Sequence, residues 1–559
     1  MPIPRSMLDR SPAADLDLEV VGTWPAEIGG ELVIATADRT SAVGGHAFYG
    51  DGVLIRVGLR PATMGAADGR HAWRPRRIDS PSARLRDLRP DLFTPSPIGT
   101  SSPFGISNAS NTQPLPWDGR LFVTWDAGRP VEVDPVSAAW LGDVGHRDAW
   151  APAIDHPVLP LVVSSAHPVI DPERGCLWTI SHDPVHGVLH VVRVDLADAG
   201  PRVTRWPVAG AHVPQSMHTV AQTEHWLVMV DCAFKADPNE IFGLGPRAIT
   251  TNTTAPAFLV RKDQLDEVAP GQPVDPVALT LAPETMHYWA AWDDRDGVRI
   301  TYERTNETDL AFWLSADDRD ADGHPVDPRF AGMYCHPMSP GGVSILEIDP
   351  DAATVRERAD IADREKYWAT QLSTNDLSPA GLKASTRHHQ VFSGYKPELI
   401  CQRALDLYER EGRIDRRALP GSETAGRLVS IDRTDGSVVG EWAFALDEYP
   451  CSPAYVPRPG GEPGGHDGWV TVPVLRDDGL RIDLFDAGDP STGPLAALRA
   501  PGGRTVPFML HATWSPDAQV ADRSIPRTRF ADDLDHRVDA LEPELAALAR
   551  QVASDLDAR

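Results

Sequence analysis

The feature that most constrains the fold of this chain is a short unit that recurs along most of its length. Each unit is a run of alternating apolar residues that ends in an Asp, often followed by Pro or Gly. Alternation bounded by such turn residues predicts antiparallel β-hairpins. Hairpins spread over most of a long chain predict an all-β architecture repeated around an axis, most simply a β-propeller. Examples of the unit are residues 129–135 (RPVEVDP), 191–195 (VVRVD), 344–350 (SILEIDP), 427–432 (RLVSID) and 481–486 (RIDLFD).

Composition excludes several classes of partner. The formal net charge of −27 would repel the phosphates of nucleic acids and anionic lipids, so no nucleic acid is expected to bind. The five cysteines are odd in number and widely spaced, which favours reduced thiols in a cytoplasmic protein. The N-terminus lacks a signal-peptide pattern, and no apolar run is long enough to span a membrane.

Two segments depart from the strand pattern. Residues 360–425 contain a candidate helix over 397–411, which predicts a partly helical lid or insertion. Residues 515–559 form a C-terminal extension in which apolar residues recur at helical spacing. This stripe predicts an amphipathic helix that docks onto the body of the protein or, as the alternative, forms a dimer contact. Its members are Leu541, Leu545, Leu548, Val552 and Leu556.

Four of the nineteen histidines stand out by their context. Seven others lie in polar, turn-like settings and are expected to be exposed: His71, His146, His182, His186, His324, His466 and His536. The four instead lie where an apolar strand begins or ends, beside aromatic residues or Met: His167, His218, His287 and His511.

These four histidines are too far apart in the chain for a local metal-binding motif. A buried structural histidine is the commoner explanation for any one of them alone. In a propeller, however, the inner strand of every blade runs close to the central axis, so distant histidines can converge there. A cluster of imidazoles would suit Fe, Zn, Cu or Ni, and the residues alone leave that choice open.

Six short segments follow one another in an order that resembles the carotenoid cleavage oxygenase family. The resemblance extends over residues 18–514 and includes all four histidines. The segments are residues 44–53 (GGHAFYGDGV), 111–112 (NT), 119–130 (GRLFVTWDAGRP), 166–168 (AHP), 217–218 (MH), 286–294 (MHYWAAWDD) and 510–514 (LHATW), of which the second and third form one motif.

The resemblance implies a seven-bladed β-propeller over residues 18–514, capped by a dome of loops and short helices and preceded by an N-terminal segment, 1–17. It implies one Fe(II) on the axis, held by the four histidines. O₂ and an apolar polyene would be the reactants, and a double bond of a carotenoid, apocarotenoid or similar conjugated molecule would be cleaved into two carbonyl products. Cleavage of a stilbene-like phenylpropanoid, or a non-catalytic propeller that binds an apolar ligand, are the alternatives.

The resemblance also identifies residues around the metal. Family members place carboxylates behind the ligands to fix the imidazoles; here Asp126 occupies one such position and Ser452 replaces another, while a third carboxylate cannot be placed. Thr112 corresponds to a threonine near the open coordination positions. Trp125 matches the carotenoid-cleaving branch, whereas stilbene-cleaving relatives carry lysine there. At most a peripheral membrane contact is expected, and the oligomeric state is left open.

Overall fold

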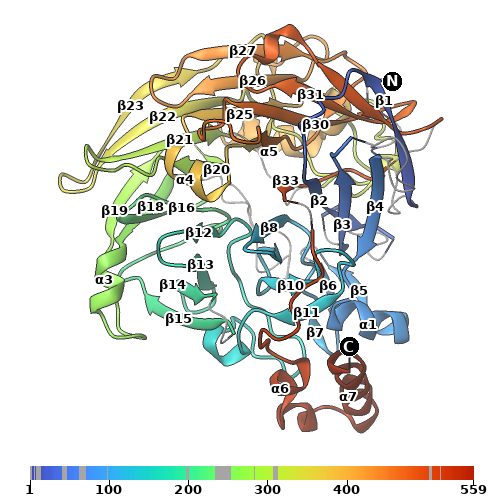
Figure 1. The fold of residues 1–559 in the computed structure, drawn as a ribbon, viewed down its shortest axis with the longest axis vertical. Coiled ribbons are helices and arrows are strands. Elements are labelled where there is room, and N and C mark those ends of the chain that lie inside the picture. The colour runs from blue at the N-terminus through green and yellow to red at the C-terminus, as the bar shows by residue number, and fades with distance from the viewer. Residues whose placement is uncertain are drawn as a thin grey trace.

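Antiparallel strands build most of the protein, as the computed structural model shows. Among the described residues, five separate four-stranded sheets and one ten-stranded sheet stand around a common centre (Figure 1). The fold is therefore all-β and propeller-like, as the recurring unit predicts. The described residues are 3–4, 7, 14–40, 47–48, 50–61, 71–96, 99–196, 200–232, 254–282, 284–305, 307, 313–502, 506–516 and 518–558.

Each four-stranded sheet is a meander of consecutive strands. Sheet by sheet, the strands are β8 (Gln113–Trp117), β9 (Arg120–Thr124), β10 (Val131–Val133) and β11 (Trp140–Asp143); β12 (Val169–Asp171), β13 (Cys176–Asp183), β14 (Val188–Asp195) and β15 (Arg202–Pro207); β16 (Val220–Gln222), β17 (Trp226–Val230), β18 (Ala255–Arg261) and β19 (Val277–Leu281); β20 (Thr285–Ala290), β21 (Val298–Arg304), β22 (Gly342–Asp349) and β23 (Thr354–Ile361); and β24 (Thr370–Thr374), β25 (Arg387–Phe392), β26 (Arg427–Asp432) and β27 (Val438–Ala443).

The recurring unit is confirmed as a β-strand followed by a turn. All five examples fall on strands, namely β10, β14, β22, β26 and β31 (Gly479–Asp486). In four of the five units the final Asp has a structural role, because its carboxylate accepts a backbone N–H group two or three residues further on. Asp134, for example, accepts from the amides of Val136 and Ser137 at 3.0 and 2.8 Å. Asp349 accepts in the same way from residues 351 and 352.

The ten-stranded sheet joins the two ends of the chain. Its first strand, β1, pairs with β4 through its first half and with β32 through its second half. The last strand, β33, pairs with β2, with Ala512 opposite Ile34. The strands are β1 (Leu16–Gly22), β2 (Glu31–Asp38), β3 (Asp51–Gly58), β4 (His71–Arg77), β28 (Tyr449–Pro450), β29 (Ala454–Pro457), β30 (Gly468–Arg476), β31, β32 (Ala496–Arg499) and β33 (Ala512–Ser515).

Short elements lie between and beside the sheets. A small three-stranded sheet consists of β5 (Thr94–Ser96), β6 (Gly99–Ser102) and β7 (Gly105–Ile106). The helices are α1 (Pro81–Leu88), α3 (Lys262–Glu267), α4 (Pro379–Ala384), α5 (Gln402–Arg410), α6 (Phe530–Leu534) and α7 (Pro543–Asp557), and the 3₁₀ turns are η2 (Pro90–Leu92), η3 (Arg147–Trp150), η4 (Pro328–Phe330), η5 (Pro397–Leu399), η6 (Arg416–Ala418), η7 (Pro490–Thr492) and η8 (Arg537–Ala540). Among the described helices, none combines the length and the apolar character needed to cross a membrane.

The prediction of a single insertion over residues 360–425 is wrong in part. Strands β24 and β25 within it belong to a four-stranded sheet. They look polar in sequence because several of their buried side chains are polar, including His388, His389 and Gln390, and all three form hydrogen bonds. The candidate helix over 397–411 is the turn η5 followed by α5.

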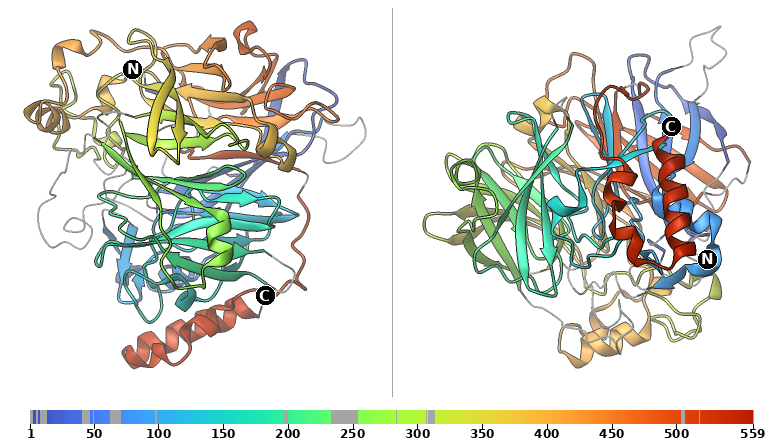
Figure 2. Two further views of the ribbon diagram at one scale, coloured as in Figure 1. Left: turned by 90° about the vertical axis from the view of Figure 1, so that its left-hand side faces the viewer. Right: turned by 90° about the horizontal axis from the view of Figure 1, so that it is seen from below.

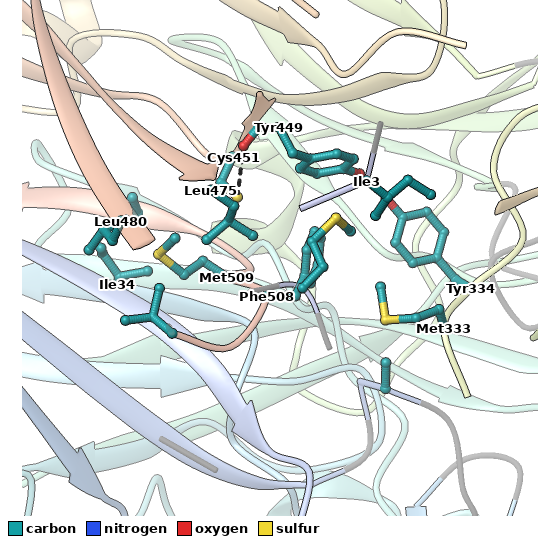
Figure 3. Close-up of a cluster of buried hydrophobic side chains, with 14 of the residues drawn as sticks. Ile3, Ile34, Met333, Tyr334, Tyr449, Cys451, Leu475, Leu480, Phe508 and Met509 are labelled. Carbon is teal, nitrogen blue, oxygen red and sulfur yellow. Dashed lines mark hydrogen bonds between the residues drawn. The ribbon is translucent and has the colours of Figure 1, made fainter. Parts of the chain in front are cut away.

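The largest apolar cluster lies between the ten-stranded sheet and the segments that carry α5 and residues 326–338. Figure 3 shows part of it, with Phe508 and Met509 between side chains of the sheet and the tyrosines Tyr334 and Tyr449. Helix α5 contributes the buried residues Leu405 and Tyr408. This cluster attaches the segments outside the sheets to the body.

The C-terminal extension docks onto the body, the first of the two alternatives for its apolar stripe. Helix α7 packs against α1 and α6 beside the sheet of β8 to β11 (Figure 2). Val552 and Leu556 of the stripe are buried there. Between the extension and the sheet, the carboxylate of Asp533 in α6 accepts hydrogen bonds from the Arg129 guanidinium and, at 3.1 Å, from the Arg147 amide.

Replacing this buried carboxylate should loosen the extension. We expect Asp533→Ala to lower the free energy of unfolding in urea by about 3 kcal/mol, because it leaves the buried Arg129 charge with fewer partners. The control is Glu544→Ala, since Glu544 also links the extension to the body, through Arg89, but its side chain is 84% exposed. That change should stay within about 0.5 kcal/mol. Equal effects of the two substitutions would contradict the assignment of Asp533 as the anchor.

A candidate metal centre on the axis

The four predicted histidines come from the inner strands of four different sheets. His511 immediately precedes β33, His167 and His218 lie two residues before the first residues of β12 and β16, and His287 lies within β20. Neighbouring inner strands are also joined to each other. The His167 amide donates to the His218 carbonyl at 3.0 Å, and the Val220 amide donates to the His167 carbonyl at 3.0 Å. The backbone thus holds two of the histidines in register.

The structure brings all four imidazole rings together. The centroid of the His167 ring lies 4.6 Å from that of His218, 4.8 Å from that of His287 and 4.2 Å from that of His511. The Nε2 atoms of His167 and His218 are 3.1 Å apart. Candidate ligand atoms of His167, His218 and His287 all lie within 4.8 Å of one another. Three nitrogen donors at this spacing, with the His511 ring beside them, can surround one metal ion.

Burial keeps these imidazoles ready to bind a cation. The pKa of His167 lies well below its usual value, first because of desolvation and then because of repulsion by His511, His218 and His287. The pKa of His511 is lowered for the same reasons. Neutral imidazoles offer a lone pair to a metal without first losing a proton.

His287 gives an independent test of whether a metal fits. Its Nδ1 and Nε2 atoms are both buried, and within the described residues neither makes a hydrogen bond. A buried polar atom without a partner is costly. A cation held among the four rings would satisfy Nε2, so the residues present fit a bound metal ion.

Each of three rings has a polar group at its Nδ1 atom. Asp126 accepts from His218 Nδ1, with its two oxygens at 2.8 and 3.0 Å. The side-chain oxygen of Gln113 lies 2.7 Å from His167 Nδ1. A carboxylate oxygen of Glu303 lies 3.3 Å from His287 Nδ1. Such groups fix the orientation of an imidazole and make it a stronger ligand.

Gln113 and Glu303 are absent from the sequence-based predictions. Glu303 is a carboxylate on β21, the strand beside His287, and it is fully buried. A charged residue at a buried strand position is the signal that could have identified it, because such a charge needs a partner. Gln113 directly follows Thr112 and has no charge to distinguish it.

Ser452 lies close to His511 but contacts the backbone rather than the ring. Its hydroxyl accepts a hydrogen bond from the Ala512 amide at 2.9 Å. In the part of the chain that the structure describes, no carboxylate pairs with the His511 ring. Ser452 can therefore position the segment that carries His511, but it does not orient the imidazole.

Two cavities meet at the histidines. The smaller, of 80 Å³, is lined by Thr112, Trp125 and mostly apolar side chains, and it reaches His218, His287 and His511. The larger, of 680 Å³, is lined by more polar groups and reaches His167, His287 and His511. The four imidazoles thus lie between an apolar cavity and a more polar one. The apolar walls of the smaller cavity include Phe48, Met286, Leu372, Phe508 and Leu510.

Two of the segments that carry the family resemblance touch each other beside this cavity. The Asn111 side-chain amide donates to the carbonyls of Phe48 and Gly50 at 2.5 and 3.0 Å. Gly52 is required here, because a Cβ atom at this position would lie 2.1 Å from the carbonyl oxygen of Ser110. Residues 44–46 and 49 of the first segment lie outside the described residues.

Two histidines expected to be exposed are buried instead. His71 and His182 are only 4% and 3% exposed. His71 Nδ1 lies 2.8 Å from the Gly58 carbonyl on the neighbouring strand, and burial lowers the pKa of His182 to about 4. Both residues lie on strands whose polar appearance in sequence hides a covered position.

Comparison with known proteins agrees with this architecture. The family model described as retinal pigment epithelial membrane protein, RPE65, matches residues 5–516. The chain therefore belongs to this family, the carotenoid cleavage oxygenases, which confirms the resemblance seen in the sequence.

Individual relatives are distant. Resveratrol cleavage oxygenase 1 of Chaetomium globosum is 23% identical, over 89% of this chain and 84% of that protein. Carotenoid cleavage dioxygenase 7 of Oryza sativa subsp. japonica, a chloroplastic protein, is 22% identical over 74% of this chain and 72% of that protein. The crystal structure of Pseudomonas brassicacearum lignostilbene dioxygenase matches with a TM-score of 0.63 at 17% identity, covering 92% of this chain and 100% of that chain.

The different contacts of Asp126 and Ser452 lead to a prediction about metal affinity. Asp126→Asn removes the charge behind His218, so we expect Fe(II) affinity to fall about 10- to 100-fold in competition with a chelator. Ser452→Ala should leave the affinity within about twofold, because the hydroxyl contacts only backbone. A larger loss in the Ser452 variant than in the Asp126 variant would contradict this division of roles.

Proposed function

We propose that His167, His218, His287 and His511 hold one Fe(II) ion, and that the protein is a dioxygenase of conjugated apolar molecules. With O₂, it would cleave one carbon–carbon double bond of a carotenoid, apocarotenoid or similar substrate into two carbonyl products. The observation that carries this proposal is the convergence of four imidazoles from four sheets at the end of an apolar cavity. When bound, the iron would supply Lewis-acid and redox chemistry towards O₂.

The side chains around the centre would have three tasks. Asp126, Gln113 and Glu303 would hold the imidazoles in one orientation through their Nδ1 atoms. Trp125 and its apolar neighbours would exclude water and contact the substrate by dispersion. Thr112, beside the same cavity, would limit the space next to the metal.

We also propose that the sheets make up seven blades. Five are the separate four-stranded sheets, and the ten-stranded sheet would contain two. One of these would be β33, β2, β3 and β4, and the other β28 or β29 with β30, β31 and β32. In support of this count, the two halves of β1 pair with different partners. Within such a body, over residues 18–514, the segments outside the sheets would form the dome, with residues 1–17 and 515–559 as flanking segments.

The cellular setting is a further part of the proposal. All five cysteines are buried and none is in a disulfide, which favours a reducing compartment such as the cytoplasm. The reactants would be O₂ and an apolar small molecule, with at most peripheral contact with a membrane that stores it.

Stilbene cleavage is the second candidate, because two relatives are named for resveratrol and lignostilbene cleavage. A propeller that only binds an apolar ligand is the third. The decisive measurement is the iron content of the purified protein together with O₂-dependent loss of polyene absorbance. Removal of iron by a chelator should abolish cleavage, and Fe(II) should restore it. A protein that remains inactive after Fe(II) is restored would rule out the first two candidates.

The ligand assignment has a direct test. His287→Ala should reduce bound iron to a small fraction of one ion per chain while leaving the far-ultraviolet circular dichroism unchanged, because it removes one of four donors. His225→Ala is the matched control, since His225 is half-exposed and pairs with Asp294 at 2.8 Å. It should keep its iron. Full iron content in the His287 variant would show that this residue is not a ligand.

A further inference from the structure

A chain of hydrogen-bonded polar side chains crosses the apolar core and ends at the smaller cavity. The side-chain amide of Gln371 on β24 donates to the Tyr334 hydroxyl. The Tyr334 and Tyr449 hydroxyls are 2.9 Å apart, and Tyr449 lies 3.1 Å from His336 Nε2. Figure 3 shows the hydroxyl ends of the two tyrosines directed towards each other.

This chain is rigid and uncharged. Tyr334, His336 and Tyr449 are each at least 98% buried. Burial lowers the pKa of His336 to about 3, so its imidazole is neutral. The Tyr334 ring also stacks on His336 with centroids 5.0 Å apart and lies against Phe508. A hydrogen-bonded network enclosed in this way holds its members in fixed positions.

Gln371 is the member of the chain that can meet a ligand. It lines the same cavity as His218, His287 and His511, and so does Tyr334. One N–H of its Nε2 atom donates to Tyr334, and within the described residues its Oε1 atom accepts no hydrogen bond. Apart from the histidines and Asp126, the wall around it is mostly apolar, so an unoccupied amide oxygen there can discriminate between ligands.

We propose that Gln371, held in place by Tyr334, binds a hydroxyl group of the substrate and makes the enzyme selective for a substrate that carries one close to the cleaved bond. A hydroxyl can donate a hydrogen bond to the free Oε1 atom. A carbonyl or an ether only accepts hydrogen bonds, so neither can satisfy this atom.

The lining of the cavity limits where this hydroxyl can be. The smaller cavity touches Gln371 and three of the imidazoles at once. A group that contacts Gln371 therefore lies in the same cavity as a bond placed at the metal. This matches a ring-hydroxylated stilbene, whereas the terminal hydroxyl of a long carotenoid cleaved near its centre would lie much further away.

The inference rests on the proposed function, and a pair of matched substrates tests it. 4-Hydroxystilbene and stilbene differ only in the hydroxyl. We expect the iron-loaded wild type to favour 4-hydroxystilbene in kcat/KM by about tenfold, as one hydrogen bond would give. Gln371→Leu should bring the two values to within about twofold of each other. Tyr334→Phe, which removes the anchor of the amide, should raise KM for the hydroxylated substrate and leave kcat nearly unchanged.

Met286→Leu is the matched control, because Met286 lines the same cavity without a polar group. It should change both substrates alike. The same preference should also hold for binding measured by quenching of tryptophan fluorescence in the absence of O₂, which requires no turnover. An unchanged preference in the Gln371 variant and the Tyr334 variant would overturn the inference.

A third substrate separates failure of this inference from failure of the proposed function. If the wild type cleaves β-carotene or an apocarotenoid but neither stilbene, the inference is wrong and the proposed function stands. If the iron-loaded protein cleaves none of the substrates, the proposed function is wrong. The fluorescence measurement then decides alone whether Gln371 recognises the hydroxyl, and equal binding of the two stilbenes would overturn that as well.

Discussion

The pairing of β2 with β33 is the interaction on which the candidate site depends. These strands come from opposite ends of the chain, and their hydrogen bonds place Ala512 opposite Ile34. His511 precedes β33 directly, so this pairing carries it to the other three histidines. The backbone hydrogen bonds between the His167 and His218 segments likewise hold these two histidines beside each other. Closure of the ring of sheets and the position of His511 therefore depend on the same strand pairing.

Around the imidazoles, the structure distributes the orienting groups differently from the sequence-based prediction. His218 is held by a carboxylate, that of Asp126. His167 is held by the neutral Gln113, and His287 lies beside Glu303 on the adjacent strand. His511 depends on the position of its backbone, which Ser452 supports. The four imidazoles thus differ in their orienting groups, and the two carboxylates lie behind His218 and His287.

The polar groups of the smaller cavity suggest how one scaffold can serve different substrates. The four histidines and Gln371 lie on or beside inner strands, whereas Tyr334, which holds Gln371, comes from a segment outside the sheets. Changes in that segment can alter which ligand fits without disturbing the imidazoles. The support of the recognition residue is then separate from the candidate metal ligands, which agrees with the placement of functional groups on loops over a rigid frame.

The sequence by itself indicated the strand-and-turn repeat, the convergence of the four histidines and the family. Each of these depends on local patterns or on short motifs in a fixed order. The sequence could not identify Glu303 or Gln113, since their importance comes from which side chain lies across a sheet or between sheets. It also indicated an insertion where β24 and β25 belong to a sheet, because their polar residues are paired in the interior. It indicated exposed positions for His71 and His182, which are buried. Only the tertiary structure decided these points, because burial and hydrogen-bond partners are properties of the packed chain and not of the order of its residues.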